Sequence, residues 1–147
     1  MFLSQTAEYA LRSMAWLATA PEGEPIRATD LSLATGIPSH YLSKVLRRLV
    51  VAKLLKSQKG QGGGFCLSRA PENIAFVEIL SAVDAYPTEE HCAFGWGECD
   101  SADRCPLHDS WSHLKDRIRE WAVGTNLNEI SKYSPTGPRF ASHEKRG

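Results

Sequence analysis

The sequence has no long apolar run, and its 147 residues carry a formal net charge of zero. Because no stretch is long and apolar enough to span a bilayer, we expect no membrane partner. Residues 1–18, MFLSQTAEYALRSMAWLA, lack the basic start and unbroken apolar block of a secretory signal. We therefore expect a cytoplasmic protein, in which cysteines stay reduced and serve metal or redox chemistry before they form disulfides.

Signatures of catalysis are also missing. The glycine-rich segment 60–64 contains no Gly-Lys-Ser/Thr and is followed by a strand pattern rather than a helix, which argues against a nucleotide phosphate loop. No nucleophile stands at a recognisable spacing from a base, and the cysteine-rich segment supplies enough ligands to fill a metal site by itself. We therefore expect neither an enzyme nor a small-molecule substrate.

Carboxylates are absent from residues 38–69. The same range holds seven basic residues: Lys44, Arg47, Arg48, Lys53, Lys56, Lys59 and Arg69. Residues 71–130 have the opposite balance, with twelve acidic residues against four basic ones. A short basic run is often only a solvated face, but a range of this length without an acid favours a polyanionic partner.

A helix is predicted over residues 4–19, because apolar side chains recur there at steps of three and four, with Ser4 or Thr6 as its cap. Residues 27–36 predict a short helix that Gly36 ends, and a further helix begins near Pro38. Two short helices joined by a tight glycine-containing turn are typical of a helix-turn-helix. The buried stripe predicted for the second of them consists of Tyr41, Leu42, Val45, Leu46, Leu49 and Val50, and the opposite face carries His40, Ser43, Lys44, Arg47 and Arg48.

Residues 54–70, LLKSQKGQGGGFCLSRA, have the pattern of two strands around a glycine loop. Lys59 and Gln61 lie in this loop, whose glycines allow its backbone to approach another surface closely. A helix-turn-helix followed by a basic hairpin is a winged helix. Cys66, in the second strand, is expected to be a small buried hydrophobe rather than a ligand.

A short helix is predicted within residues 71–86 and a longer amphipathic helix over 108–130. The apolar stripe of the longer helix consists of Trp111, Leu114, Ile118, Trp121 and Ala122. We expect this stripe to form a homodimer contact, with packing on its own domain as the alternative. The predicted fold class is mainly α, with four parts: a winged helix-turn-helix DNA-binding domain with a small two-stranded wing (1–84), a cysteine-rich loop (85–108), a long dimerisation helix (109–130) and a disordered tail (131–147).

The segment CAFGWGECDSADRCPLH, residues 92–108, contains Cys92, Cys99, Cys105 and His108. It is too polar to fold by burying apolar surface, so a metal centre would order it instead. By ligand type, three thiolates and an imidazole suit zinc and an iron–sulfur cluster equally. The segment lacks the close cysteine pair common in zinc sites, so its wide spacing favours a cluster, with zinc or metal-free redox thiols as the alternatives. His91 is a further candidate ligand.

These motifs together resemble the Rrf2 family of dimeric winged-helix transcription regulators, which has iron–sulfur members. The resemblance covers residues 1–130 and rests on EYALRSMAWLA, GIPSHYLSKVLRRL, KGQGGGFCLSRAPENI, AVD and CPLHDSW. The wing followed by the three-cysteine loop is its most specific feature. The resemblance implies a homodimer that binds a double-stranded DNA operator under the control of an iron–sulfur cluster, which would sense iron, redox state or nitric oxide.

Site residues also follow from the resemblance. It implies that Cys92, Cys99 and Cys105 bind the cluster and that His108 is the fourth ligand. In other members the fourth ligand is an acidic residue from the first helix of the partner subunit, a position that corresponds to Glu8. The residues expected to contact DNA are Ser39, His40, Ser43, Lys44, Arg47, Arg48, Lys59 and Gln61.

The sequence departs from the family members in three places, one of which is Ser43, a smaller and less discriminating reader of bases than a carboxylate. The first cysteine gap is one residue longer, which leaves open the fourth ligand and whether the cluster has two irons or four. Lys59 replaces an arginine at the wing tip, and lysine cannot make the planar fork contact of arginine. The alternative functions are a zinc-stabilised or thiol-redox regulator without a cluster and, from another class, an iron–sulfur carrier or electron-transfer protein, which would not need the basic helix and wing.

Overall fold

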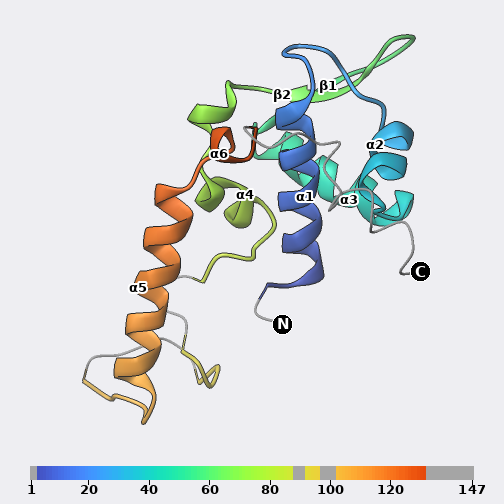
Figure 1. The fold of residues 1–147 in the computed structure, drawn as a ribbon. Helices are drawn as coiled ribbons and strands as arrows, with labels where there is room; N and C mark the ends of the chain where they lie inside the picture. The colour runs from blue at the N-terminus through green and yellow to red at the C-terminus, as the bar shows by residue number, and fades with distance from the viewer. Residues whose placement is uncertain (1–2, 88–91, 97–101, 132–147) are drawn as a thin grey trace.

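The structure is a computed structural model that describes residues 3–87, 92–96 and 102–131. Over these residues the chain is mostly helical, with a small antiparallel sheet (Figure 1). The predicted helix-turn-helix and two-stranded wing are both present, whereas the predicted tail lies outside the described residues from residue 132 onward. The elements along the chain are α1 (Gln5–Thr19), α2 (Ala28–Thr35), α3 (Ser39–Val51), β1 (Leu55–Gln58), β2 (Gly64–Leu67), the 3-10 turn η1 (Pro71–Asn73), α4 (Phe76–Ala82), α5 (His108–Gly124) and α6 (Asn128–Ser131).

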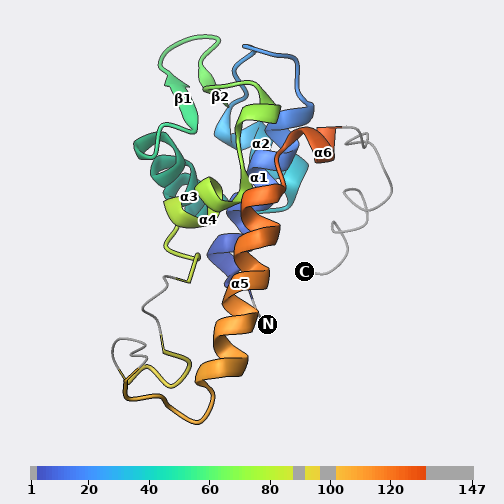
Figure 2. The ribbon, with the colours of Figure 1, turned by 90° about the vertical axis from the view of Figure 1, so that its left-hand side faces the viewer.

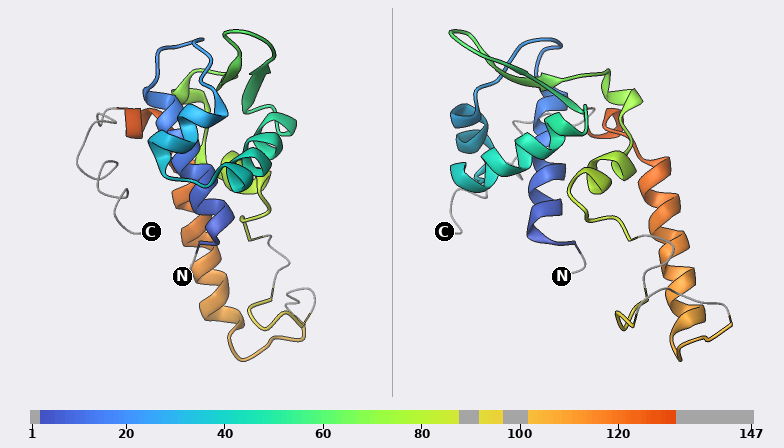
Figure 3. Two further views of the ribbon diagram at one scale, coloured as in Figure 1. Left: turned by 90° about the vertical axis from the view of Figure 1, so that its right-hand side faces the viewer. Right: turned by 180° about the vertical axis from the view of Figure 1, so that it is seen from behind.

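Helix α1 lies at the centre of the core. Ser4 caps it as predicted, because the Ser4 Oγ accepts a hydrogen bond from the Ala7 amide at 3.2 Å. Ala10 and Met14 on α1 are fully buried. Helices α2 and α3 lie on one side of α1, and α4 and α5 lie on the other (Figure 3). The helix-turn-helix and the helices after the wing therefore share a single hydrophobic core.

The helix-turn-helix follows the predicted pattern, but two residues of the predicted buried stripe differ: Tyr41 is exposed, and Val50 is only half-buried. Gly36 ends α2 in the left-handed conformation, at φ 71°, and the next helix starts at Ser39. Leu42, Val45, Leu46 and Leu49 are buried, as predicted for α3. Tyr41 was predicted in the same stripe but is exposed, with its ring 4.1 Å from that of His40 and 6.2 Å from that of Tyr9. Its position at the edge of the stripe leaves 45% of its surface exposed.

The wing is a two-stranded hairpin that rests on the loop between α1 and α2. Strands β1 and β2 are antiparallel, with Gln58 opposite Gly64 at the tip end. Ile26 adds a bridge to Phe65: the Ile26 amide donates to the Phe65 carbonyl with an N···O distance of 2.9 Å, and the Phe65 amide donates to the Ile26 carbonyl at 2.8 Å. A Cβ at Gly64, whose φ is +147°, would lie 2.4 Å from the Ile26 carbonyl. The close approach predicted for the glycine run is therefore made here to the chain's own backbone.

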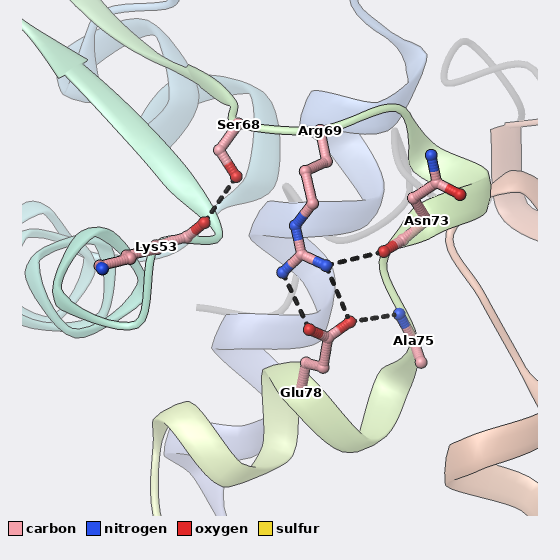
Figure 4. Close-up of polar contacts among 6 residues, drawn as sticks. All are labelled: Lys53, Ser68, Arg69, Asn73, Ala75 and Glu78. Atoms are coloured by element: carbon pink, nitrogen blue, oxygen red, sulfur yellow. Dashed lines mark hydrogen bonds and ion pairs between the residues drawn. The ribbon is translucent and has the colours of Figure 1, made fainter.

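Arg69 and Glu78 join the base of the wing to α4 (Figure 4). The Arg69 Nη2 donates to the Glu78 Oε1 at 2.8 Å, and the Ala75 amide donates to the Glu78 Oε2 at 3.1 Å. Burial raises the pKa of Glu78, but the hydrogen bonds from Arg69 and Ala75 outweigh it, so the pKa lies below its ordinary value. On the other side of the wing base, the Ser68 Oγ donates to the Lys53 carbonyl at 2.6 Å. The wing is thus held to both neighbouring elements.

Helix α5 ends earlier than the periodicity predicted. Its last residue is Gly124 rather than a residue near position 130, and the separate helix α6 begins at Asn128. Between the two helices the backbone bonds to the start of α4 and to the segment before it: the Phe76 amide donates to the Thr125 carbonyl at 2.9 Å and the Leu127 amide to the Ile74 carbonyl at 3.1 Å. Leu127 is also completely buried. Together these hydrogen bonds and this burial stabilise the chain more than further turns of α5 would.

The other end of α5 projects away from the wing, and the described part of the cysteine loop lies beside it (Figure 2). None of the helices that the structure describes has the length and apolar character needed to cross a bilayer.

Candidate functional site

The outward face of α3 carries the predicted DNA-contacting side chains. Ser39, His40, Ser43, Lys44 and Arg47 are all exposed, and none belongs to the buried stripe of the helix. The wing lies beside α3 (Figure 2), and Lys59 and Gln61 are exposed in the turn between its strands. The face and the wing tip therefore offer cations and hydrogen-bonding groups on adjoining surfaces of the protein.

The two serines of this face have local hydrogen bonds that limit what they can recognise. The Ser43 Oγ donates to the Ser39 carbonyl at 2.9 Å, as helical serines often do. The Ser39 Oγ donates to the Ser32 Oγ at 3.3 Å. With their protons engaged, both hydroxyls have lone pairs left to accept hydrogen bonds, for instance from the amino group of cytosine or adenine.

Arg48 differs from the other predicted DNA contacts, because its side chain is paired within the protein. Its Nη2 lies 2.5 Å from the Oδ2 of Asp84, just beyond the C-terminus of α4. The side chain of Arg48 is 38% exposed and that of Asp84 is 90% exposed. Sequence reasoning missed Asp84 because the two residues are 36 positions apart, and no local pattern joins them.

Cys92 and Cys105 come together at the N-terminal end of α5. Their sulfur atoms lie 4.0 Å apart, and Cys92 is buried while Cys105 is half-buried. The His108 amide donates to the Cys105 carbonyl at 3.0 Å, so the histidine stands one turn from the second cysteine, as the first residue of α5. Cys99 and His91 lie outside the described residues. Glu8 is half-buried in the first turn of α1.

The backbone of the residues that follow Cys92 affects the pKa of its thiol. Hydrogen bonding to the backbone of Phe94 is the largest influence on this thiol and lowers its pKa, and the backbones of Trp96 and Gly95 act in the same direction. Burial opposes them, and the net result is a pKa below the ordinary value. Hydrogen bonds from backbone N–H groups also stabilise metal-bound thiolates.

The distance between the two sulfurs suits ligands of a single metal ion. Two thiolates on one tetrahedral metal, each with a bond of about 2.3 Å, lie about 3.8 Å apart. The observed separation of 4.0 Å is close to this value. Within the described segments no three His, Cys, Asp or Glu side chains converge on one point, and Cys99 falls outside those segments. The two described thiols therefore fit half of a tetrahedral site, for zinc or for one iron of a cluster.

Cys66 stands apart from this pair. It lies in β2, opposite Lys56 on β1, and is half-buried rather than fully buried as predicted. Its strand is in the wing, whereas the cysteine loop lies at the far end of α5 (Figure 1). Cys66 is therefore separate from Cys92 and Cys105.

The stripe predicted as a dimer contact remains partly uncovered. Leu114 and Trp121 on α5 keep 43% and 42% of their surface exposed, although Ala122 in the same stripe is fully buried. The Trp121 ring packs edge-on against Phe76 of α4, with centroids 5.5 Å apart. The helix therefore uses one edge of its stripe on its own domain and leaves much of the rest open.

Comparison with known proteins gives the family. The family model Rrf2, "Iron-dependent Transcriptional regulator", matches residues 3–133. The HTH-type transcriptional regulator IscR of Escherichia coli K12 is 33% identical over 130 residues, which span 88% of this chain and 80% of that protein.

Two solved structures show the same fold. CymR, the global cysteine regulator of B. subtilis, superimposes with a TM-score of 0.73 at 24% identity, covering 90% of this chain and 97% of that one. IscR of T. potens gives a TM-score of 0.71 at 22% identity, covering 88% of this chain and 85% of that one. The predicted mainly α, winged-helix fold class is confirmed by these likenesses. The family model and the IscR relative are both described as transcriptional regulators, so the chain is not an enzyme and belongs to the Rrf2 family of transcription regulators.

Proposed function

We propose that this protein is a cytoplasmic, homodimeric transcription regulator whose operator binding is controlled by an iron–sulfur cluster. The observation that carries the cluster is the pair of sulfurs, Cys92 and Cys105, 4.0 Å apart in a setting of backbone donors. An electron-transfer protein is not proposed, because the chain belongs to a family of transcription regulators. Such a protein would also not need the exposed basic face of α3.

DNA recognition would use α3 and the wing together. With α3 in the major groove, His40, Ser43 and Lys44 would meet base edges, since these exposed residues stand on successive turns of one helix face. Arg47 would contact phosphate, together with Lys53 and Lys56, and such contacts supply affinity and its dependence on salt. Lys59 at the wing tip would approach the minor groove.

The dimer would form through the open stripe of α5. Leu114 in this stripe keeps 43% of its surface exposed, and covering apolar surface of this kind is the main driving force for association. A two-fold dimer would place two copies of α3 on a pseudo-palindromic operator.

The cluster ligands would be Cys92, Cys99, Cys105 and His108, with the partner's Glu8 as the alternative fourth ligand. A bound cluster supplies a centre that changes with iron supply, oxidation or nitric oxide. The loop that would hold it leads directly into α5, whose stripe would form the dimer contact. Loss of the cluster would therefore alter the spacing of the two α3 helices, which is a two-state switch.

A second candidate is a thiol-redox or zinc-stabilised regulator without a cluster. The same observation favours it, because two sulfurs 4.0 Å apart also suit one zinc ion, or a disulfide after a small movement. The thiol-redox alternative also has a parallel among proteins of the same fold: CymR of S. aureus has been solved in an oxidized form, and it superimposes with a TM-score of 0.69 at 23% identity.

Purification without oxygen separates these candidates. The cluster predicts a coloured protein with iron and acid-labile sulfide, and the zinc site predicts a colourless protein with zinc alone. C105S should remove the metal, whereas the matched control C66S should keep it, because Cys66 lies in the wing. Protein without iron or sulfide would contradict the cluster. Equal affinity of loaded and cluster-free protein for DNA selected from a random library would contradict the switch.

A further inference from the structure

Arg48 is the only residue among the expected DNA contacts for which the structure describes an ion pair with an acid. The segment 38–69 has no carboxylate of its own, so the competing charge has to come from elsewhere in the chain. It comes from Asp84, whose Oδ2 lies 2.5 Å from the Arg48 Nη2. The pair connects the flank of the recognition helix to the end of α4, and the two helices also pack on each other.

The backbone conformation at Asp84 ends α4 without any contribution from the Asp84 side chain. Its φ is +52°, and α4 ends there in a Schellman motif, with the Asp84 amide donating to the Ser81 carbonyl and the Ala85 amide to the Leu80 carbonyl. Glycine is the usual residue at this position, because a Cβ is disfavoured in the left-handed region. An aspartate here places a carboxylate within reach of α3.

We propose that Asp84 is a positioning residue that lowers DNA affinity by holding the Arg48 guanidinium away from the phosphate backbone. This inference rests on the proposed DNA-binding function. A phosphate that approaches α3 has to compete with Asp84 for Arg48, whereas Lys44 and Arg47 stand exposed on the same helix. Because the chain turns at Asp84 toward the cysteine loop, the pair also gives that loop a direct link to the recognition helix.

The substitution D84N tests this. Asparagine tolerates the left-handed conformation, so the helix end should be kept while Arg48 is released. The strength of exposed ion pairs predicts a gain in affinity of about two- to fivefold per subunit. One added phosphate contact per subunit should make the slope of log K against log salt steeper by about 1.8 for the dimer. A merely structural role of Asp84 would not steepen this slope.

The probe is a fluorescein-labelled duplex of 30 base pairs and random sequence, because phosphate contacts do not depend on the operator. Anisotropy titrations between 50 and 200 mM salt would compare the full-length wild type with D84N, R48A and the double variant. E72Q removes an exposed carboxylate from η1 and is the matched charge control. D84G also suits the left-handed position and should reproduce the gain.

Each result decides one way. A gain in D84N that is absent from E72Q and disappears in the R48A background supports the inference. No gain, or a gain of equal size in the R48A background, overturns it, since general charge repulsion would then suffice. Failure of the wild type itself to bind the duplex at low salt would instead refute the proposed DNA-binding function.

Discussion

Replacing Leu114 by alanine tests the proposed dimer. Leu114 keeps 43% of its surface exposed on α5. Full burial of a leucine side chain contributes about 1.5–3 kcal/mol, so covering the exposed part contributes about 0.6–1.3 kcal/mol. A two-fold interface contains the residue twice, which makes the loss about 1.3–2.6 kcal/mol. The dimer dissociation constant should therefore rise about ten- to eightyfold.

Sedimentation equilibrium over a wide range of protein concentrations measures this constant directly. The matched control is Leu33→Ala, because Leu33 is an equally apolar side chain on α2 that is 78% exposed. It should leave the constant unchanged. A dimer that is unaffected by Leu114→Ala, or one weakened equally by Leu33→Ala, would show that the subunits meet through another surface.

Three further predictions concern the wing, α4 and the DNA face. Glu78→Gln should lower the free energy of unfolding by about 1 kcal/mol at neutral pH, after allowance for solvent screening. Because the pKa of Glu78 is lowered in the folded protein, this contribution is complete above the ordinary value of 4.5 and is lost as the pH falls through the folded-state value. Urea unfolding at pH 7 and at a series of pH values below 4.5 should show the difference between the two proteins and its decrease with falling pH. Gly64→Ala should destabilise the protein by about 1–3 kcal/mol in thermal unfolding, because its Cβ would meet the Ile26 backbone, whereas Gly124→Ala, with open space around it, should have little effect. Lys44→Ala should weaken binding to a random-sequence duplex and reduce the salt slope by about 0.9 per subunit if the ammonium contacts phosphate, and an unchanged slope would assign Lys44 to base contacts alone.

Local patterns were sufficient for most of the secondary structure. The apolar spacing over residues 4–19 and the glycine at position 36 predicted the start and end of helices correctly, because capping and periodicity involve neighbours in sequence. The end of α5 was predicted wrongly. Its periodicity continued, but the backbone around Thr125 bonds to the start of α4 and the residues before it, about fifty residues earlier, and such a partner leaves no local signal.

The candidate sites divide in the same way. The types of donor in the cysteine loop, the absence of acids from residues 38–69 and the exposed face of α3 could be predicted from residue identity and helical spacing. The pairing of Cys92 with Cys105 at 4.0 Å could not, because the twelve residues between them allow many separations.

The sequence by itself therefore determined the order of the elements and the chemistry that each one carries, since both depend on residues close together in the chain. Only the tertiary structure decided which groups are free to act. Arg48 looks like its neighbour Arg47 in the sequence, yet packing of α4 against α3 brings Asp84 to one and not to the other. The physical reason is that the electrostatic partner of a side chain depends on distance in space, which the packed core sets.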